Sequence, residues 1–156
     1  MKIVVDANIV FSGILNTKGK IGDLLINSRG LIDLIAPDFL RNEIRKHYAK
    51  LVKISKLSIE QIIESEFQIC KGIEFISEEQ IIKTNWEIAF NLVKDVDEKD
   101  IHYVAFSKQF NRKIWSGDKQ LIRGLKKKEF DGFISTEDLY IIREDLKRLK
   151  ERRKRK

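Results

Sequence analysis

Short apolar segments rich in β-branched residues, separated by longer segments of helical periodicity, constrain the fold of this chain most strongly. Residues 2–5 read Lys-Ile-Val-Val without polar alternation, which is typical of a strand buried on both faces of a parallel sheet. Similar short strands are predicted over 31–36, 113–116 and 132–135, with a short extended segment over 73–76. Buried strands separated by helices indicate an α/β fold with a mostly parallel sheet.

The segments between these strands carry apolar residues at helical spacing. The clearest pattern follows Pro37-Asp38, where Leu40, Ile44, Tyr48 and Leu51 recur on one side of a single helix. Further helices are predicted over 9–15, 21–28, 58–71, 84–94, 98–110 and 119–125, and from Thr136 onward.

The positive charge of the chain is concentrated at its C-terminal end. The 156 residues carry a net charge of +7. Residues 143–156 hold nine Lys and Arg against three acids, which leaves +1 for the rest. The length fits one domain, so we expect a domain over 1–142 followed by a basic C-terminal helix end or tail over 143–156. Such a tail either binds phosphate backbones or is a solvated helix end.

Several classes of protein are disfavoured by simple features of the sequence. The lone Cys70 excludes an intramolecular disulfide and a cysteine-based metal cluster. Asp6 and Asn8 interrupt the apolar N-terminus where an export signal needs a clean apolar stretch. No run approaches the roughly 20 apolar residues of a membrane span. We therefore expect a cytoplasmic protein without a membrane partner.

Acidic residues lie near the ends of the predicted strands. Asp6 directly follows the first strand, and Asp118 follows the strand over 113–116 after one intervening residue. Glu43 lies one helical turn beyond the second strand, and Asp100 lies at the start of the helix over 98–110. Ligand sites of open α/β sheets lie at the carboxyl ends of the strands, so parallel strands would bring these four acids together.

Each acid also has a structural interpretation. Asp118 fits the N-cap of the helix over 119–125, and Asp97 with Asp100 fits a capping pair for the next helix. Glu43 fits an ion-pair partner on a helix rich in basic residues. Asp6 is hardest to explain structurally, because a carboxylate at the end of a buried strand needs a partner.

A cluster of carboxylates needs something that cancels its repulsion. Burial and like charge raise carboxyl pKa values, whereas a divalent cation favours the ionised form. Hard oxygen ligands without His or Cys suit Mg²⁺ or Mn²⁺, which also bind substrate phosphate. The four acids therefore favour phosphodiester hydrolysis over acyl transfer.

Four segments containing these acids resemble the motifs of the PIN-domain nucleases. Residues 4–13 (Val-Val-Asp-Ala-Asn-Ile-Val-Phe-Ser-Gly) are similar to the first motif, and residues 36–44 to the second, in which a Glu follows a Pro-started helix. Residues 97–106 contain Asp-x-x-Asp before an Ala-containing helix, as in the third motif. Residues 115–121 (Trp-Ser-Gly-Asp-Lys-Gln-Leu) are similar to the fourth, with Ser where Thr is usual.

The resemblance implies a fold and a chemistry. The fold would be a PIN-like three-layer α/β/α sandwich around a mostly parallel sheet of about five strands. The chemistry would be RNA cleavage that depends on one or two Mg²⁺ or Mn²⁺ ions. The expected catalytic residues are Asp6, Glu43, Asp100 and Asp118, of which Asp6, Asp100 and Asp118 bind the metal. Residues expected to orient the carboxylates are Asn8, Ser116 and Asp97.

Basic residues near the acids are candidates for contact with single-stranded or structured RNA. The expected RNA-binding residues are Arg41, Arg45, Lys46 and Lys50, with Lys126, Lys127 and Lys128 and the tail as further candidates. His47 and His102 are interpreted as bystanders. Phe11 and Trp115 are interpreted as core residues.

Small single-domain PIN proteins are often toxins of VapC-type toxin–antitoxin pairs. The resemblance therefore implies an antitoxin partner and a homodimer. The apolar seam of the C-terminal helix, which is Leu139, Ile142, Leu146 and Leu149, packs either on its own domain or on such a partner. Two alternatives stay open: a non-catalytic PIN module that binds RNA or protein, and a DNA-directed nuclease.

Overall fold

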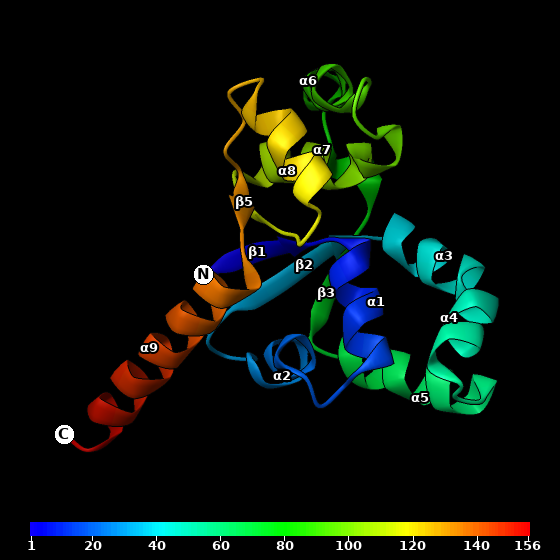
Figure 1. Cartoon of the computed structure of the whole chain (residues 1–156). Helices are drawn as coiled ribbons and strands as arrows, with labels where there is room; N and C mark the ends of the chain where they lie inside the picture. The colour runs from blue at the N-terminus through cyan, green and yellow to red at the C-terminus, as the bar shows by residue number, and fades with distance from the viewer.

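A five-stranded parallel sheet forms the centre of the molecule, with helices on both faces (Figure 1). The computed structural model describes all 156 residues. The strands are β1 (Lys2–Val5), β2 (Asp33–Pro37), β3 (Ile73–Ile76), β4 (Ile114–Trp115) and β5 (Phe133–Ile134). They lie in the order β3-β2-β1-β4-β5, and every neighbouring pair is parallel. The predicted α/β fold with about five parallel strands is confirmed.

Nine α-helices and two short 3₁₀ turns connect the strands. The α-helices are α1 (Ala7–Leu15), α2 (Lys20–Asn27), α3 (Phe39–Lys46), α4 (Tyr48–Ser55), α5 (Ile59–Cys70), α6 (Lys83–Val93), α7 (Ile101–Phe110), α8 (Lys119–Lys126) and α9 (Thr136–Lys154). The 3₁₀ turns are η1 (Glu78–Gln80) and η2 (Glu98–Asp100). None of the helices combines the length and the apolar character needed to cross a lipid bilayer.

Alternating side chains of the strands divide the core between two helical layers. In β1, Ile3 and Val5 belong to one apolar cluster, and Val4 between them belongs to the other. The first cluster lies against α1, α2, α5 and α9, and the second against α6, α7 and α8 (Figure 1). Both faces of the sheet are therefore buried, which explains why its strands lack polar alternation. The three-layer sandwich is confirmed.

Two predicted helices are interrupted. The single helix expected after Pro37-Asp38 is instead α3 and α4, with a break at His47. Nδ1 of His47 lies 2.7 Å from the backbone oxygen of Glu43, to which it donates a hydrogen bond. This side-chain contact competes with regular helical bonding and ends α3. The helix expected over 98–110 begins as η2 and becomes α-helical only at Ile101.

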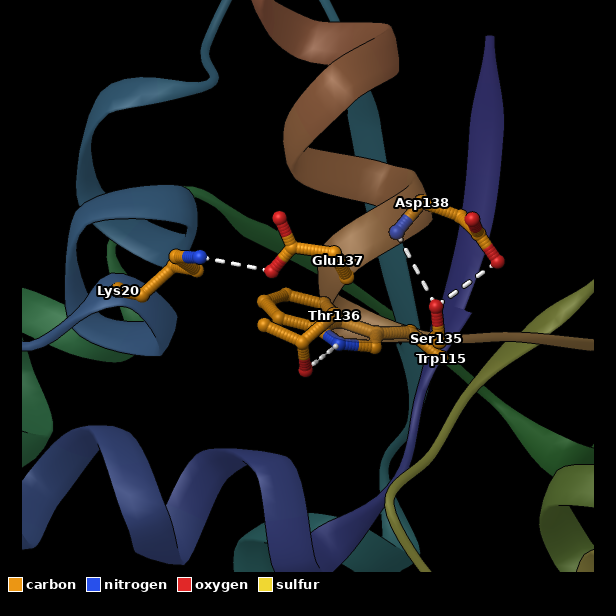
Figure 2. A network of polar contacts seen from close by, with 6 residues as sticks. All are labelled: Lys20, Trp115, Ser135, Thr136, Glu137 and Asp138. Atoms are coloured by element: carbon orange, nitrogen blue, oxygen red, sulfur yellow. Dashed lines mark hydrogen bonds and ion pairs between the residues drawn. The ribbon is translucent and has the colours of Figure 1, made fainter.

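The start of α9 is fixed to the sheet and to α2. Figure 2 shows the indole of Trp115 donating a hydrogen bond of 3.0 Å to the hydroxyl of Thr136. It also shows Lys20 of α2 paired with Glu137, with 2.7 Å between Nζ and Oε2. The helix begins at Thr136, as the sequence predicts, and Ser135 is its N-cap. The helix then continues without a break through the expected boundary at residue 142.

Candidate active site

The two central strands of the sheet end at neighbouring acids. From β1 the chain moves outward through β2 and β3, and later returns to place β4 on the other side of β1. Asp6 follows β1 and Asp118 comes shortly after β4, so both lie at this switch point, where open α/β sheets bind ligands. Their Oδ1 atoms accept backbone hydrogen bonds from Ile9 (2.9 Å) and Leu121 (3.0 Å). Each acid thereby caps a helix N-terminus, where the helix dipole favours negative charge.

All four predicted acids line one hollow of about 150 Å³. Asp6 and Asp118 come from the switch point, Glu43 from α3 and Asp100 from the end of η2. Asn8 and Asp97 line the same hollow. Four segments that are distant in the sequence therefore meet at the carboxyl edge of the sheet.

Burial and nearby negative charge raise the pKa values of two acids of the hollow, Asp6 and Asp100. Asp6 is only 2% exposed. Burial raises its pKa from 3.8 to about 6, against the opposing effect of a hydrogen bond from Ser116. Burial also raises the pKa of Asp100 to about 7, with further contributions from the charges of Asp97, Asp6 and Asp118. A nearby cation would relieve both effects.

The ligand types in the hollow suit a hard divalent ion. No group of three or more His, Cys, Asp or Glu side chains is arranged so that it could hold a metal ion. The carboxylates of Asp6, Asp100 and Asp118 nevertheless face one hollow, with pKa values raised at two of them. Mg²⁺ and Mn²⁺ prefer such oxygen ligands and keep several bound waters. The protein therefore does not need to supply every ligand of the ion. The donor types present fit such an ion, although their spacing in this structure does not close around one.

A distant acid holds the start of the helix that carries Glu43. Asp38 precedes α3 without capping it through its side chain. Oε1 of Glu78, in η1, instead accepts a hydrogen bond of 2.7 Å from the backbone N–H of Phe39. Glu43 itself is partly buried, and its Oε1 lies 3.5 Å from Nζ of Lys46. Local sequence patterns do not reveal this role of Glu78, because its contact is made across 39 positions.

The three residues expected to orient the carboxylates lie close to them. Ser116 is 2% exposed, its hydroxyl accepts from the backbone N–H of Asp118 at 3.1 Å, and it also bonds the side chain of Asp6. Asp97 is exposed and caps η2 by accepting from the N–H of Lys99 at 3.0 Å. Asn8 is exposed at the hollow, where its backbone N–H lowers the pKa of Asp6.

The hollow also contains side chains that sequence reasoning missed. Tyr103 is 3% exposed, and its hydroxyl has no hydrogen-bond partner. Burial and the nearby acids raise the pKa of this hydroxyl. Tyr103 comes three positions after Asp100, a spacing that places both on one helix face and could have revealed it. Lys99 and His47 also line the hollow, and the interpretation of His47 as a bystander stays a prediction.

The other aromatic and histidine predictions have mixed outcomes. Trp115 is fully buried, as predicted, whereas Phe11 is half-buried and lines the hollow. His102 does not line the hollow. Its ring stacks on Phe39 with 3.8 Å between centroids and meets Trp86 edge-on.

The four expected RNA-binding cations do not share one surface. Lys46 pairs with Glu43, and Lys50 lines a groove between α1 and α4 that adjoins the hollow. Arg41 and Arg45 line a different groove, between α3 and α5. The guanidinium of Arg41 lies there over the ring of Phe75, 3.7 Å from its centroid. Only Lys46 and Lys50 are therefore beside the acids.

Lys128, a further candidate for RNA contact, binds the C-terminal end of α6 instead of facing the hollow. Its Nζ donates to the backbone oxygens of Asn91 (3.1 Å) and Leu92 (2.9 Å) and pairs with Asp95. These contacts satisfy carbonyls at the end of α6. Lys126 and Lys127 are exposed.

Comparisons with known proteins identify the family and support the fold. Residues 4–150 match a family model described as PIN domain. No curated protein sequence matches the chain. Among solved structures, VapBC2 from Rickettsia felis, crystallised with a DNA fragment from its promoter, is similar with a TM-score of 0.62 and 12% identity, over 86% of this chain and 97% of that one.

A second solved structure shows the same likeness. PAE2754 from Pyrobaculum aerophilum is similar with a TM-score of 0.65 and 11% identity, over 93% of this chain and 90% of that one. At such low identity these two structures support the fold alone, whereas the family model covers almost the whole chain. The chain belongs to the PIN-domain family.

Proposed function

We propose that the chain is a cytoplasmic endoribonuclease that depends on Mg²⁺ or Mn²⁺ and whose active site is the acidic hollow. PIN domains are generally nucleases. The observation that carries the proposal is the convergence of Asp6, Glu43, Asp100 and Asp118 on one hollow at the switch point of the sheet. A cluster of partly buried carboxylates fits phosphodiester hydrolysis, in which bound cations and a negatively charged substrate meet.

We assign a separate role to each acid of the hollow. Asp6, Asp100 and Asp118 would hold one or two ions, and Glu43 would complete the site or orient the attacking water. A divalent ion bound there supplies neutralisation of phosphate charge and a lower pKa for a water molecule. Ser116 fixes the two carboxylates that flank the switch point, since it bonds both Asp6 and the backbone of Asp118.

The surroundings of the hollow favour single-stranded or looped RNA. The hollow is small, at about 150 Å³, so an exposed strand can reach it more easily than a duplex. Lys99 inside it, Lys46 at Glu43 and Lys50 in the adjoining groove supply positive charge for the backbone. Arg41 and Arg45, in their separate groove, would reach only more distant phosphates.

The test is cleavage of a mixed single-stranded RNA pool in Mg²⁺, Mn²⁺ or EDTA, beside matched DNA. Asp6→Asn keeps an oxygen that can cap α1, so it removes the charge while preserving the fold. Asp131→Asn, in the exposed loop before β5, is the matched control. We expect metal-dependent RNA cleavage that is lost in Asp6→Asn and retained in Asp131→Asn.

Other outcomes point to the alternatives. Preferential cleavage of DNA would favour a DNA-directed nuclease. RNA binding without cleavage in any metal would favour a non-catalytic RNA-binding module.

We further propose that the chain is the toxin of a toxin–antitoxin pair and acts as a homodimer with an antitoxin partner. The likeness to VapBC2 and the motif resemblance support this role. Induced expression in a bacterial host should arrest growth for the wild type and leave Asp6→Asn cells unaffected. Growth arrest by both forms would separate toxicity from the hollow and contradict the proposal.

A further inference from the structure

The last ten residues of the chain, which include the C-terminal end of α9, carry the whole net charge of the protein. Residues 147–156 contain eight Lys and Arg against one Glu, a balance of +7. The preceding 146 residues carry 23 basic and 23 acidic residues and are neutral as a set. The acidic hollow therefore belongs to a neutral body, and the positive charge lies in one helical segment.

This basic end lies far from the acidic hollow. α9 begins at the carboxyl edge of the sheet, directly after β5, and runs back toward the opposite edge. Its 19 residues span about 28 Å. Near its end, Nζ of Lys150 is 3.4 Å from the backbone oxygen of Gly30, which precedes β2. Figure 1 shows the red end of α9 projecting past the sheet on the side away from α3.

A groove beside α9 extends the basic surface. It lies between α2 and α9, has a volume of about 620 Å³ and is lined mainly by polar side chains. Lys147, Lys150 and Lys154 line it from α9, and Arg29 lines it from the loop after α2. None of these four cations forms an ion pair. Three acids, Asp23, Glu144 and Glu151, line the same groove, so its lining as a whole holds five cations against three carboxylates.

Buried charges at the base of the groove are already paired. The guanidinium of Arg143 is almost fully buried and pairs with Asp23 of α2. Its Nε also lies 2.7 Å from Oε1 of Glu144, but the two atoms are not aligned for a hydrogen bond. The pair with Asp23 ties α9 to α2, whereas the contact with Glu144 lies within α9. The base of the groove thus holds one cation against two carboxylates, and the unpaired cations lie on its rim.

The spacing of the cations on the rim fits a polyanion with regularly spaced charges. Lys147, Lys150 and Lys154 recur at i, i+3 and i+7, so they lie along one side of the helix. Only Leu149 is apolar within 147–156, so this segment lacks the apolar face by which amphipathic helices insert into membranes. A nucleic-acid backbone fits the row better than a lipid surface.

We propose that the α2–α9 groove and the basic end of α9 form a second RNA-binding surface. It binds the phosphate backbone of a long substrate at a distance from the acidic hollow, while another part of the same substrate occupies the hollow. This inference rests on the proposed ribonuclease function. A stacked strand has one phosphate per roughly 3.4 Å, so reaching along α9 requires on the order of eight nucleotides. RNA of five nucleotides can occupy only one of the two surfaces.

The test is the affinity of fluorescent single-stranded RNAs of five and 25 nucleotides in EDTA, so that binding is read without cleavage. The triple variant Lys147→Gln, Lys150→Gln and Lys154→Gln should weaken binding of the long RNA at least tenfold. It should lower the slope of log K against log salt by about 2, and it should weaken the short RNA less than the long one, because the short RNA spans only part of the basic surface. The matched control replaces the exposed Lys18, Lys53 and Lys83 by Gln and should change neither affinity beyond twofold.

Two results would overturn the inference. One is long-RNA affinity equal to that of the wild type in a triple variant with an unchanged melting temperature. The other is loss of binding to phosphatidylserine vesicles in the variant while RNA affinity persists, which would assign the groove to a membrane. A chain that binds long RNA through these lysines but cuts no RNA in Mg²⁺ or Mn²⁺ would contradict the proposed activity and leave this surface standing.

Discussion

The acidic hollow and the α2–α9 groove are both charged, but they are built in opposite ways. The hollow uses a few carboxylates fixed by backbone caps, and Asp6 there is only 2% exposed. The rim of the groove uses exposed lysines with no ion-pair partners, held on one long helix. Charge that is buried and capped has a defined position suited to chemistry, whereas exposed charge supplies affinity that salt can screen. Substitutions in the two regions should therefore have different kinds of effect.

The largest expected effect is on cleavage by the hollow. Asp100→Asn removes a carboxylate without changing side-chain volume much, so the fold should persist. We expect the cleavage rate to fall on the order of 10³-fold, equivalent to about 4 kcal/mol of transition-state stabilisation. Single-turnover cleavage of a five-nucleotide RNA measures this, with Asp131→Asn and the triple lysine variant as controls. Comparable loss in the lysine variant would remove the distinction between the two regions.

The second effect is a loss of stability with rising pH, which the hollow should show and the groove should not, because the hydrogen bond from Arg143 lowers the pKa of Asp23. The pKa values of Asp6 and Asp100 are raised from 3.8 to about 6 and about 7, so the folded state holds these protons more tightly than the unfolded state does. Their contribution to stability is present below about pH 4 and is lost as the pH rises to about 7. For Asp6 alone the loss corresponds to about 3 kcal/mol.

Urea unfolding in EDTA at pH 4.5 and 7.5 measures this dependence. Asp6→Asn cannot ionise, so its stability relative to the wild type should increase between the two pH values. Subtracting the two proteins removes the contribution of other titrating groups. An equal response of both proteins to pH would show that the buried carboxylate carries no penalty.

The third effect concerns the groove, in which Arg143 is the buried cation and can be compared with an exposed lysine. Arg143→Ala leaves Asp23 without its partner, although the side chain of Asp23 is 38% exposed and partly solvated. We expect a loss of about 2 kcal/mol in unfolding free energy, less than for a fully buried pair. Lys147→Ala, one turn further on and exposed, should change stability by less than about 0.5 kcal/mol. Equal effects would mean that burial does not separate the two cations.

The smallest effect concerns the uncharged group of the hollow. Tyr103→Phe removes a buried hydroxyl that has no hydrogen-bond partner, so stability should rise by about 1 kcal/mol. Cleavage should fall about fivefold, the loss of one hydrogen bond to the substrate or its water. Thermal unfolding and single-turnover cleavage measure the two quantities. A less stable variant with unchanged cleavage would assign the hydroxyl to structure.

The sequence predicted those parts of the fold that depend on local pattern. Ile3, Val4 and Val5 lack polar alternation because both faces of β1 are covered, and this signal is direct. The break at His47 was not predictable from periodicity, since Ile44 and Tyr48 keep helical spacing across it. It depends on a side-chain hydrogen bond to Glu43, and a pattern of apolar residues does not register such a bond.

The candidate site was predictable to the extent that its residues follow strands. Asp6 and Asp118 were accessible in this way, because parallel strands place their carboxyl ends at one edge. Glu78 was not, because its cap on Phe39 depends on the packing of η1 against α3. The separation of Arg41 and Arg45 from the hollow was missed for a related reason, since the orientation of α3 decides which groove each side chain enters.

The central claim is that the acidic hollow binds a divalent metal ion, and calorimetric titration with Mn²⁺ tests it most directly. The wild type and Asp131→Asn should bind one or two ions, and Asp100→Asn should bind at least tenfold more weakly. Equal binding by all three proteins, or no binding by the wild type, would contradict the account.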